Sequence, residues 1–260
     1  MNYFIEGLQG SGKTTHDHKI HKNKADQILI KEGEYSPVEL AWCAYLDEKT
    51  YQNILNSYPD MKQVIEGKTY SEKDHRIVCY TKVRTDNKRF YQDLERYEIY
   101  NGRISYEDFR SIVLSRFKAW DQDGMIFECS LFQNIIEDMI LFRCFSDEQI
   151  IGFYKEVKEV LKDKDYQIIY LKSEDIKGNL NVIRKERSDD KGKELWFPLM
   201  MRYFNDSPYA KANALRGEDD LIGHFRHRQD LELRICEEVF ADKYTVLLSK
   251  RYTDEEIKGL

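Results

Sequence analysis

Short apolar runs separated by longer amphipathic stretches characterise this chain. The apolar runs lie at 3–5, 27–31, 124–127, 166–171 and 244–248. Polar residues, glycine or aspartate bound each run, which is typical of strands buried in a parallel sheet. Apolar residues at three-to-four spacing predict helices at 38–58, 105–120, 131–162 and 222–241. The third of these stretches is expected to break near residues 144–147. Because strands and helices alternate, the pattern predicts an α/β fold with right-handed crossovers.

A glycine-rich stretch follows the first apolar run directly. From Gly7 it reads G-L-Q-G-S-G-K-T, which satisfies the pattern G-x-x-x-x-G-K-S/T between a strand and a helix. Glycines let the backbone close around phosphate oxygens, and the N-terminus of the next helix adds partial positive charge. In such a loop Lys13 reaches the β- and γ-phosphates and the Thr14 hydroxyl ligates Mg²⁺. The chain is therefore expected to bind a nucleoside triphosphate. The expected binding residues are Gly7, Gln9, Gly10, Ser11, Gly12, Lys13, Thr14 and Thr15.

Composition and charge narrow the class of protein. Of the 260 residues, 34% are charged and 41% hydrophobic, as in a soluble globular protein. The net charge of -6 disfavours nonspecific binding of nucleic acid. No stretch approaches the roughly 20 apolar residues of a membrane span, and no basic leader precedes the first strand. The five cysteines are scattered without C-x-x-C spacing, which predicts a reduced, cytoplasmic protein without a zinc or disulfide signature.

Two segments are too long to be simple connections between the predicted strands. In an α/β protein that binds phosphate, such segments are the natural places for an acceptor-binding region and a mobile lid. We expect a helical acceptor-binding region at about 43–120 and a lid at about 174–220. No stretch has the composition of a linker, so residues 1–260 are expected to form a single domain.

Acidic residues follow the second and third predicted strands. In an open α/β sheet, ligands bind beyond the carboxyl ends of the strands. Glu32 and Glu34 are therefore candidates for the group that accepts or orients the proton of an attacking hydroxyl, the alternative being a solvated acidic turn. Glu128 ends the third strand and is the candidate Mg²⁺ ligand, together with Thr14.

Basic residues gather beyond the fourth predicted strand. A charge run of this kind is often only a solvated helix face. In a lid, however, Arg184, Lys185 and Arg187 would bring cations onto the transferring phosphate, and the arginine fork binds phosphate oxygens bidentately. A second basic stretch, 224–228, could help to clamp phosphate but fits a solvated helix face better.

Together these residues resemble the deoxynucleoside kinase and thymidylate kinase group of P-loop kinases. Glu32 follows Lys13 at an interval similar to that between the lysine and the base of this group. The stretch 128–132 (E-C-S-L-F) resembles the group's motif after strand three, although Cys129 stands where those kinases place an arginine. The stretch 185–190 (K-E-R-S-D-D) is similar to its lid. The resemblance covers less than half of the chain, and the glycine-rich loop is its most specific part.

This resemblance implies a three-layer P-loop NTPase fold. A five-stranded parallel sheet in the order 2-3-1-4-5 would carry helices on both faces and a helical lid. It also implies ATP as the phosphoryl donor with Mg²⁺. Glu32 would be the base, although Glu34 could equally fill that role, and Glu128 would lie near the metal.

The expected function is Mg²⁺-ATP-dependent phosphoryl transfer to a small acceptor, above all a nucleoside or nucleotide. One alternative is a small-molecule or antibiotic phosphotransferase on the same scaffold. Another is an ATPase or switch module that acts on a protein partner. Residues 171–175 (L-K-S-E-D) do not supply an N-K-x-D pattern, which disfavours a GTPase. The expected partner is a small-molecule acceptor, without nucleic acid or membrane, and a homodimer is compatible with these properties.

Overall fold

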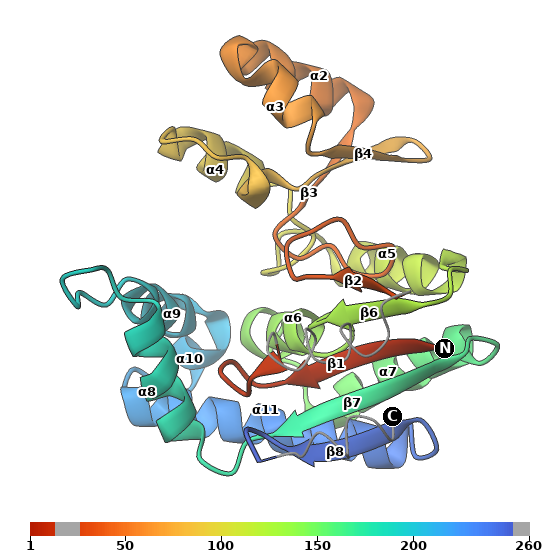
Figure 1. Cartoon of the computed structure of the whole chain (residues 1–260), viewed down its shortest axis with the longest axis vertical. Coiled ribbons are helices and arrows are strands. Elements are labelled where there is room, and N and C mark those ends of the chain that lie inside the picture. Colours follow the sequence, from red (N-terminus) through yellow and green to blue (C-terminus); the bar gives the residue numbers. More distant parts are fainter. Residues whose placement is uncertain (14–26, 252–260) are drawn as a thin grey trace. The chain divides into compact units, whose positions relative to one another are not determined.

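The computed structural model describes residues 1–13 and 27–251 of the chain. Its contacts group the chain into two compact units, one of Met1–Leu29 with Asp121–Leu260 and one of Ile30–Trp120 (Figure 1). The sequence predicts a single domain with an acceptor-binding region at about 43–120. The second unit contains that whole region and starts some residues earlier. Each unit has a sheet and buried side chains of its own, so each is described by itself.

A five-stranded parallel sheet forms the centre of the first unit. Its strands are β1 (Asn2–Gly7), β2 (Ile28–Ile30), β6 (Met125–Glu128), β7 (Tyr166–Lys172) and β8 (Tyr244–Leu248). They lie side by side in the order β2-β6-β1-β7-β8 (Figure 1). Because β6 is the third of these strands in the chain, the order is the expected 2-3-1-4-5. All five strands arise from the apolar runs that predict them.

The three central strands are buried on both faces. Phe4, Phe127 and Ile168 are 0% exposed, and the rings of Phe4 and Phe127 stack with their centroids 5.1 Å apart. A side chain of this size contributes roughly 1.5–3 kcal/mol to folding when it is fully buried. Strands covered on both faces have no polar side to show, which explains why they read as continuous apolar runs.

Helices flank this sheet (Figure 1). They are α6 (Gln133–Glu137), α7 (Asp147–Leu161), α8 (Ile176–Glu186), α9 (Trp196–Asp206), α10 (Pro208–Ala212) and α11 (Glu218–Glu238). The predicted break near 144–147 is confirmed. A π-helical turn (Asp138–Phe142) follows α6, Cys144 takes a left-handed φ of 53°, and Ser146 caps α7 through a capping box with Gln149.

The second unit contains a three-stranded antiparallel sheet that the sequence analysis does not predict. Its strands β3 (Ala44–Asp47), β4 (Thr69–Glu72) and β5 (His75–Val78) lie in the order β3-β5-β4. The prediction of a helix over 38–58 is wrong in its first half, because β3 occupies part of it and α2 (Glu48–Ser57) begins only afterwards. Pairing with β5 decides this, since Ala44 and Leu46 point into the core while Asp47 is exposed.

Helices and short turns complete the second unit. They are the 3₁₀ turn η1 (Pro59–Met61), α3 (Lys62–Glu66), the 3₁₀ turn η2 (Tyr80–Lys82), α4 (Lys88–Glu95) and α5 (Tyr106–Ala119). The helix α5 confirms the prediction at 105–120. Buried residues of β3, α2, β5 and α4 form a core of this unit's own, which includes Leu55, Val78 and Phe90. The region expected to be helical is therefore a mixed α/β unit.

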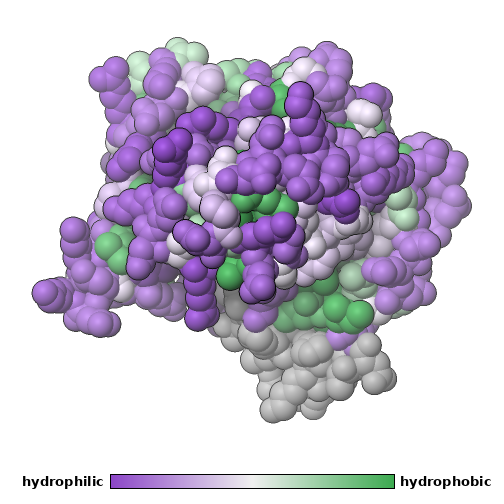
Figure 2. All heavy atoms as spheres, turned by 90° about the horizontal axis from the view of Figure 1, so that it is seen from above, coloured by the Kyte–Doolittle hydropathy of each residue, from purple (hydrophilic) through white to green (hydrophobic). Residues whose placement is uncertain are grey.

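The face drawn in Figure 2 is covered mainly by hydrophilic residues, with hydrophobic residues in smaller groups between them. This agrees with a chain in which 34% of the residues are charged. Within 1–13 and 27–251, no helix combines the length and the apolar character needed to cross a membrane.

Candidate functional site

The glycine loop (Gly7–Lys13) leaves the carboxyl end of β1 and needs its glycines for two reasons. Gly7, Gly10 and Gly12 have φ of 137°, 77° and 89°, which L side chains rarely adopt. A Cβ on Gly7 would also meet a backbone oxygen of β7 at 2.7 Å, and one on Gly10 would meet the Ile183 side chain at 2.7 Å. Within residues 1–13 and 27–251, a Cβ on Gly12 would meet nothing within 4 Å. The loop is thus packed tightly on β7 and α8 but open at Gly12.

Lys13 folds back over this loop. Its Nζ donates hydrogen bonds to the carbonyl oxygens of Gly7 (2.7 Å) and Leu8 (2.9 Å) and to Oε1 of Gln133 (3.1 Å). The side chain is only 7% exposed. All three of these acceptors are neutral oxygens, and the buried carboxyl groups of Glu6 and Glu232 lie near enough to interact electrostatically with the ammonium group. An anion would find there a positioned cation and a backbone shaped by glycines.

The carboxyl end of β6 lies beside the start of the glycine loop. Glu128 pairs in register with Ile5, and the next residue, Cys129, donates its backbone N–H to the Ile5 carbonyl at 3.1 Å. Glu128 is buried at 8% exposure. The thiol of Cys129 lies 3.5 Å from Oε1 of Gln133, the same oxygen that accepts from Lys13. Gln133 in α6 therefore contacts both Lys13 and Cys129, the residue directly after the predicted metal ligand Glu128. The sequence analysis missed Gln133, whose signal is its place at the start of the helix after the third strand.

Two further chain segments contact the glycine loop. The hydroxyl of Ser249, directly after β8, donates to the Ser11 carbonyl at 2.8 Å. The buried carbonyl of Asn179 in α8 lies where a side chain on Gly10 would clash. Strand ends and α8 thus meet at one place, as expected for the carboxyl edge of a parallel sheet. Thr14 and Thr15, predicted to bind nucleotide and Mg²⁺, lie outside the described residues.

A buried ionic cluster connects the glycine loop to α11. Arg228 is 0% exposed and donates through Nη1 to Glu137 (2.9 Å) and through Nη2 to Oε1 of Gln9 (2.8 Å). Its Nε lies 3.1 Å from Glu232, one helical turn further along α11. The interpretation of 224–228 as a solvated helix face is wrong for Arg228 and for His224, which also contacts Glu137. The i, i+4 spacing of Arg228 and Glu232 predicts that the two side chains are neighbours on one helix face, but it does not show that this face is buried.

Burial sets the charges in this cluster. Burial raises the pKa of Glu6 to about 8, although the Leu131 N–H donates to its Oε1 at 2.7 Å. Burial also opposes ionisation of Glu137, but His224 and Arg228 outweigh it and lower its pKa to about 2. Near neutral pH the cluster therefore holds a protonated Glu6 and an ionised Glu137. A protonated Glu6 adds no negative charge of its own at the end of β1, where the glycine loop begins.

The predicted lid cations differ in their surroundings. Arg184 is held by carboxylates, with Nε 2.9 Å from Glu194 and Nη1 3.1 Å from Glu218, and its guanidinium lies 4.0 Å from the Phe197 ring centroid. Arg187, at the end of α8, is exposed and lies 5.4 Å from the ring centroid of Trp196. Lys185 is exposed as well. Arg184 is thus held by ion pairs with two carboxylates, whereas Arg187 and Lys185 face solvent.

Glu32 and Glu34 belong to the second unit. Oε1 of Glu32 accepts a hydrogen bond from the Trp42 indole at 3.0 Å, and its backbone carbonyl accepts from Nζ of Lys82 at 3.3 Å. Glu34 is exposed and its Oε2 accepts from the backbone N–H of Lys31 at 3.1 Å. Of the two candidates, Glu32 is the one held by side chains from elsewhere in the unit.

The sequence analysis missed a further carboxyl group, that of Glu39. Its side chain is 4% exposed, and burial, reinforced by the charge of Glu32, raises its pKa to about 8. The short interval between Glu39 and the acidic turn was the available signal. A protonated Glu39 can donate a hydrogen bond, which an ionised carboxylate cannot do.

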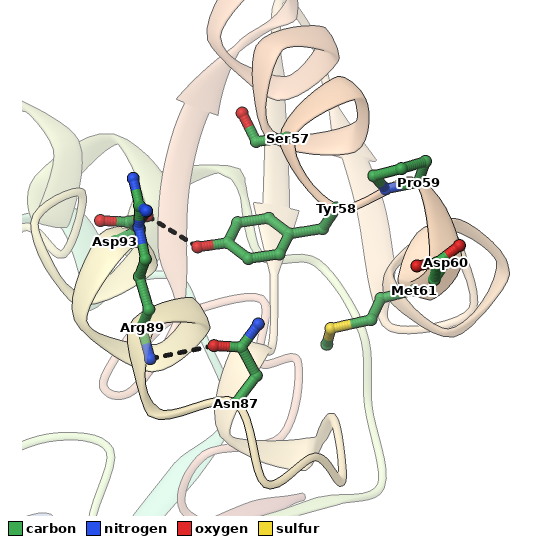
Figure 3. Close-up of a pocket in the computed structure, with 8 residues that line it drawn as sticks. All are labelled: Ser57, Tyr58, Pro59, Asp60, Met61, Asn87, Arg89 and Asp93. Carbon is green, nitrogen blue, oxygen red and sulfur yellow. Dashed lines mark hydrogen bonds and ion pairs between the residues drawn. The ribbon is translucent and has the colours of Figure 1, made fainter.

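A pocket of about 520 Å³ opens within the second unit (Figure 3). Its lining residues are Ser57, Tyr58, Pro59, Asp60, Met61, Asn87, Arg89 and Asp93. The Tyr58 hydroxyl donates to Asp93 at 2.6 Å, and the Arg89 side chain is 83% exposed beside the same carboxylate. The pocket lies inside the predicted acceptor-binding region and is lined by both polar and apolar groups.

Comparison with models of known protein families and with curated proteins finds no match to this chain. The functional assignment therefore depends on the geometry of the glycine loop and of the residues around it.

Proposed function

We propose that this protein transfers the γ-phosphoryl group of Mg²⁺-ATP to a small acceptor, a nucleoside or nucleotide. The observation that carries the proposal is the placement of Lys13. Its ammonium group lies over a loop whose three glycines have left-handed φ, directly at the carboxyl end of the central strand of a parallel sheet. That combination of cation, open backbone and strand end is suited to polyphosphate.

The fold and the strand order support a P-loop NTPase architecture. The sheet order β2-β6-β1-β7-β8 places β1, and the loop that follows it, at the centre of the sheet. Open space at Gly12 would leave room for phosphate oxygens beside the backbone. On this basis we also propose membership of the nucleoside kinase group to which the sequence shows resemblance.

Each residue of the site would have a limited task. Lys13 would neutralise negative charge on the β- and γ-phosphates, exchanging its carbonyl acceptors for phosphate oxygens. Glu128, buried at the end of β6, would hold Mg²⁺ together with Thr14. The metal would supply charge neutralisation when bound. Arg187 and Lys185 would bring cations to the transferring group when the lid closes.

Glu32 is the better supported acceptor-side base. The Trp42 indole donates a hydrogen bond to the Glu32 carboxylate, and the Lys82 ammonium group donates one to the Glu32 backbone carbonyl. Glu34, in contrast, lies on an exposed turn. A positioned carboxylate can orient the acceptor hydroxyl and take its proton in the transition state.

The proposal is tested by incubating the protein with Mg²⁺-ATP and a panel of nucleosides, nucleoside monophosphates and aminoglycosides. Phosphorylated products are identified by mass, and ADP release is followed in parallel. A phosphorylated nucleoside or nucleotide would support the proposal, and a phosphorylated aminoglycoside would support the small-molecule alternative instead. ADP release without any phosphorylated acceptor would contradict it. Lys13→Met removes the loop cation, and Lys177→Met, an exposed change on α8, is the matched control.

A further inference from the structure

The thiols of Cys43 and Cys79 are in contact inside the second unit. Their Sγ atoms are 3.5 Å apart, and the side chains are 1% and 2% exposed. The two residues are 36 positions apart in the chain, so only folding brings them together. A third cysteine, Cys144, is exposed in the first unit and has no part in this contact.

The two cysteines adjoin the last residue pair of the β3–β5 ladder. Ala44 pairs with Val78, Cys43 directly precedes Ala44, and Cys79 directly follows Val78. The backbone N–H of Cys79 donates to the Lys68 carbonyl at 2.9 Å, on the side of β4, so it does not face β3. A pair that continued this register would be a non-hydrogen-bonded one, where Cα atoms approach to about 4.5 Å, within the range that a disulfide spans.

The two thiols differ in acidity. The hydrogen bond from Cys43 lowers the pKa of the Cys79 thiol, and the charge of Lys82 lowers it further. Donating that hydrogen bond and being buried raise the pKa of the Cys43 thiol. Cys79 is thus the better nucleophile and Cys43 the natural resolving thiol.

We propose that Cys43 and Cys79 form a reversible disulfide by exchange with a small disulfide such as oxidised glutathione, and that this bond disturbs the contacts of Glu32. The thiolate of Cys79 attacks one sulfur of the oxidant, forms a mixed disulfide and releases one glutathione thiolate. The sulfur of Cys43 then attacks the Cys79 sulfur, releases the second glutathione thiolate and gives its own proton to solvent. Two cysteine thiols are oxidised and one glutathione disulfide is reduced to two thiols, so the electrons balance.

Access to these buried thiols requires only local opening. The pair lies at the end of the β3–β5 ladder, and the residue before Cys43 is Trp42, whose left-handed φ of 61° is unfavourable for a bulky side chain. The end of a strand next to a residue with unfavourable φ opens at a lower free-energy cost than the middle of a sheet.

The consequence for Glu32 follows from chain connectivity. Trp42, which donates to the Glu32 carboxylate at 3.0 Å, directly precedes Cys43. Lys82, which donates to the Glu32 carbonyl at 3.3 Å, belongs to the 3₁₀ turn that starts after Cys79. Bond formation would fix both cysteine side chains, and we expect it to shift the two adjoining chain segments that carry Trp42 and Lys82. The effect on catalysis rests on the proposed function, whereas formation of the bond does not.

The bond is tested in a Cys144→Ser background, which removes the exposed thiol. The folded protein is treated with oxidised glutathione, remaining thiols are alkylated, and linked peptides are identified by mass spectrometry. We expect one linkage, Cys43–Cys79, that dithiothreitol reverses and that Cys43→Ala or Cys79→Ala abolishes. Cys236→Ala, at a buried site on α11, is the control that should retain it. A linkage that forms only in urea, or a stable glutathione adduct on Cys79, would overturn the proposal.

The effect on Glu32 is read without relying on catalysis. Trp42 is 45% exposed, so we expect its fluorescence to change on oxidation and the change to vanish in Trp42→Phe. Acceptor phosphorylation should fall at least tenfold on oxidation and recover on reduction, while ATP affinity stays the same. An unchanged fluorescence and turnover in the oxidised protein would overturn the link to Glu32. If the reduced protein phosphorylates no acceptor, the proposed function is wrong. The linkage found by mass spectrometry and the change in fluorescence still show whether the disulfide forms and whether it affects Trp42.

Discussion

The guanidinium group of Arg228 donates a 2.8 Å hydrogen bond to the side-chain oxygen of Gln9, across 219 residues of chain. Gln9 lies in the glycine loop and Arg228 on α11. The same guanidinium contacts Glu137 and Glu232, so the loop is tied to a buried ionic cluster. This tie makes the loop conformation depend on a helix near the end of the chain.

Removing Arg228 should strongly destabilise the fold. Arg228→Met removes the guanidinium group from the buried carboxyl groups of Glu137 and Glu232 and leaves Glu137, among the described residues, with only His224; breaking a buried ion pair in this way typically costs about 3–5 kcal/mol. Urea unfolding measures the loss. Arg226→Met, at an exposed position of the same helix, is the control and should change stability by about 0.5 kcal/mol or less. The double variant Arg228→Met/Glu137→Gln removes one of the two buried carboxylates as well. If it is not more stable than Arg228→Met, the buried carboxylate of Glu137 is not the cause of the lost stability.

Stability should fall as pH rises through the range in which Glu6 titrates. Its pKa is about 8 in the folded protein and 4.5 in an unperturbed glutamate, so folding favours the protonated form. The stabilisation is complete below pH 4.5 and is lost as pH rises towards 8, by up to about 1.4 kcal/mol per pH unit. Glu6→Gln should remove this dependence. Unfolding free energies at pH 5 and pH 8 test it, with Glu66→Gln on the surface of α3 as control. If the unfolding free energies of the wild type and Glu6→Gln differ by the same amount at pH 5 and at pH 8, then Glu6 is ionised in the folded protein.

The two lid arginines should have separable effects. Arg187→Ala should lower kcat by roughly 10²–10³-fold, because an exposed cation that reaches the transition state is lost. Arg184→Ala removes contacts to Glu194 and Glu218, and should cost about 1 kcal/mol or less and speed proteolysis of 188–195. Steady-state kinetics and limited proteolysis distinguish them. An unchanged kcat in Arg187→Ala would contradict the lid assignment.

Substituting the two candidate bases, Glu32 and Glu34, one at a time should identify the base. Glu32→Gln keeps the size of the side chain but removes its basicity, so kcat should fall by roughly 10²–10⁴-fold with little change in ATP affinity. Glu34→Gln should leave kcat within about twofold, since its side chain is exposed and bonds its own turn. Full turnover in both variants would show that neither residue is the base.

Local pattern sufficed for much of the fold. The apolar runs predict all five strands of the parallel sheet, and burial on both faces explains why the three central runs are mainly apolar. The break between α6 and α7 and the helix α5 also follow from short-range periodicity. The helix expected over 38–58 was wrong because β3 is stabilised by its pairing with β5, a contact that the local pattern does not contain.

The candidate site divides in the same way. The glycine loop is recognisable from the sequence alone, because left-handed φ and close packing leave only glycine at Gly7 and Gly10. The acidic and basic residues that follow the strands are recognisable in the same way. The burial of Arg228 beneath the loop and the contact of Cys43 with Cys79 become visible only in the folded chain. Burial of a charge and contact between distant thiols arise from packing of segments far apart in the chain, and spacing in the sequence does not encode them.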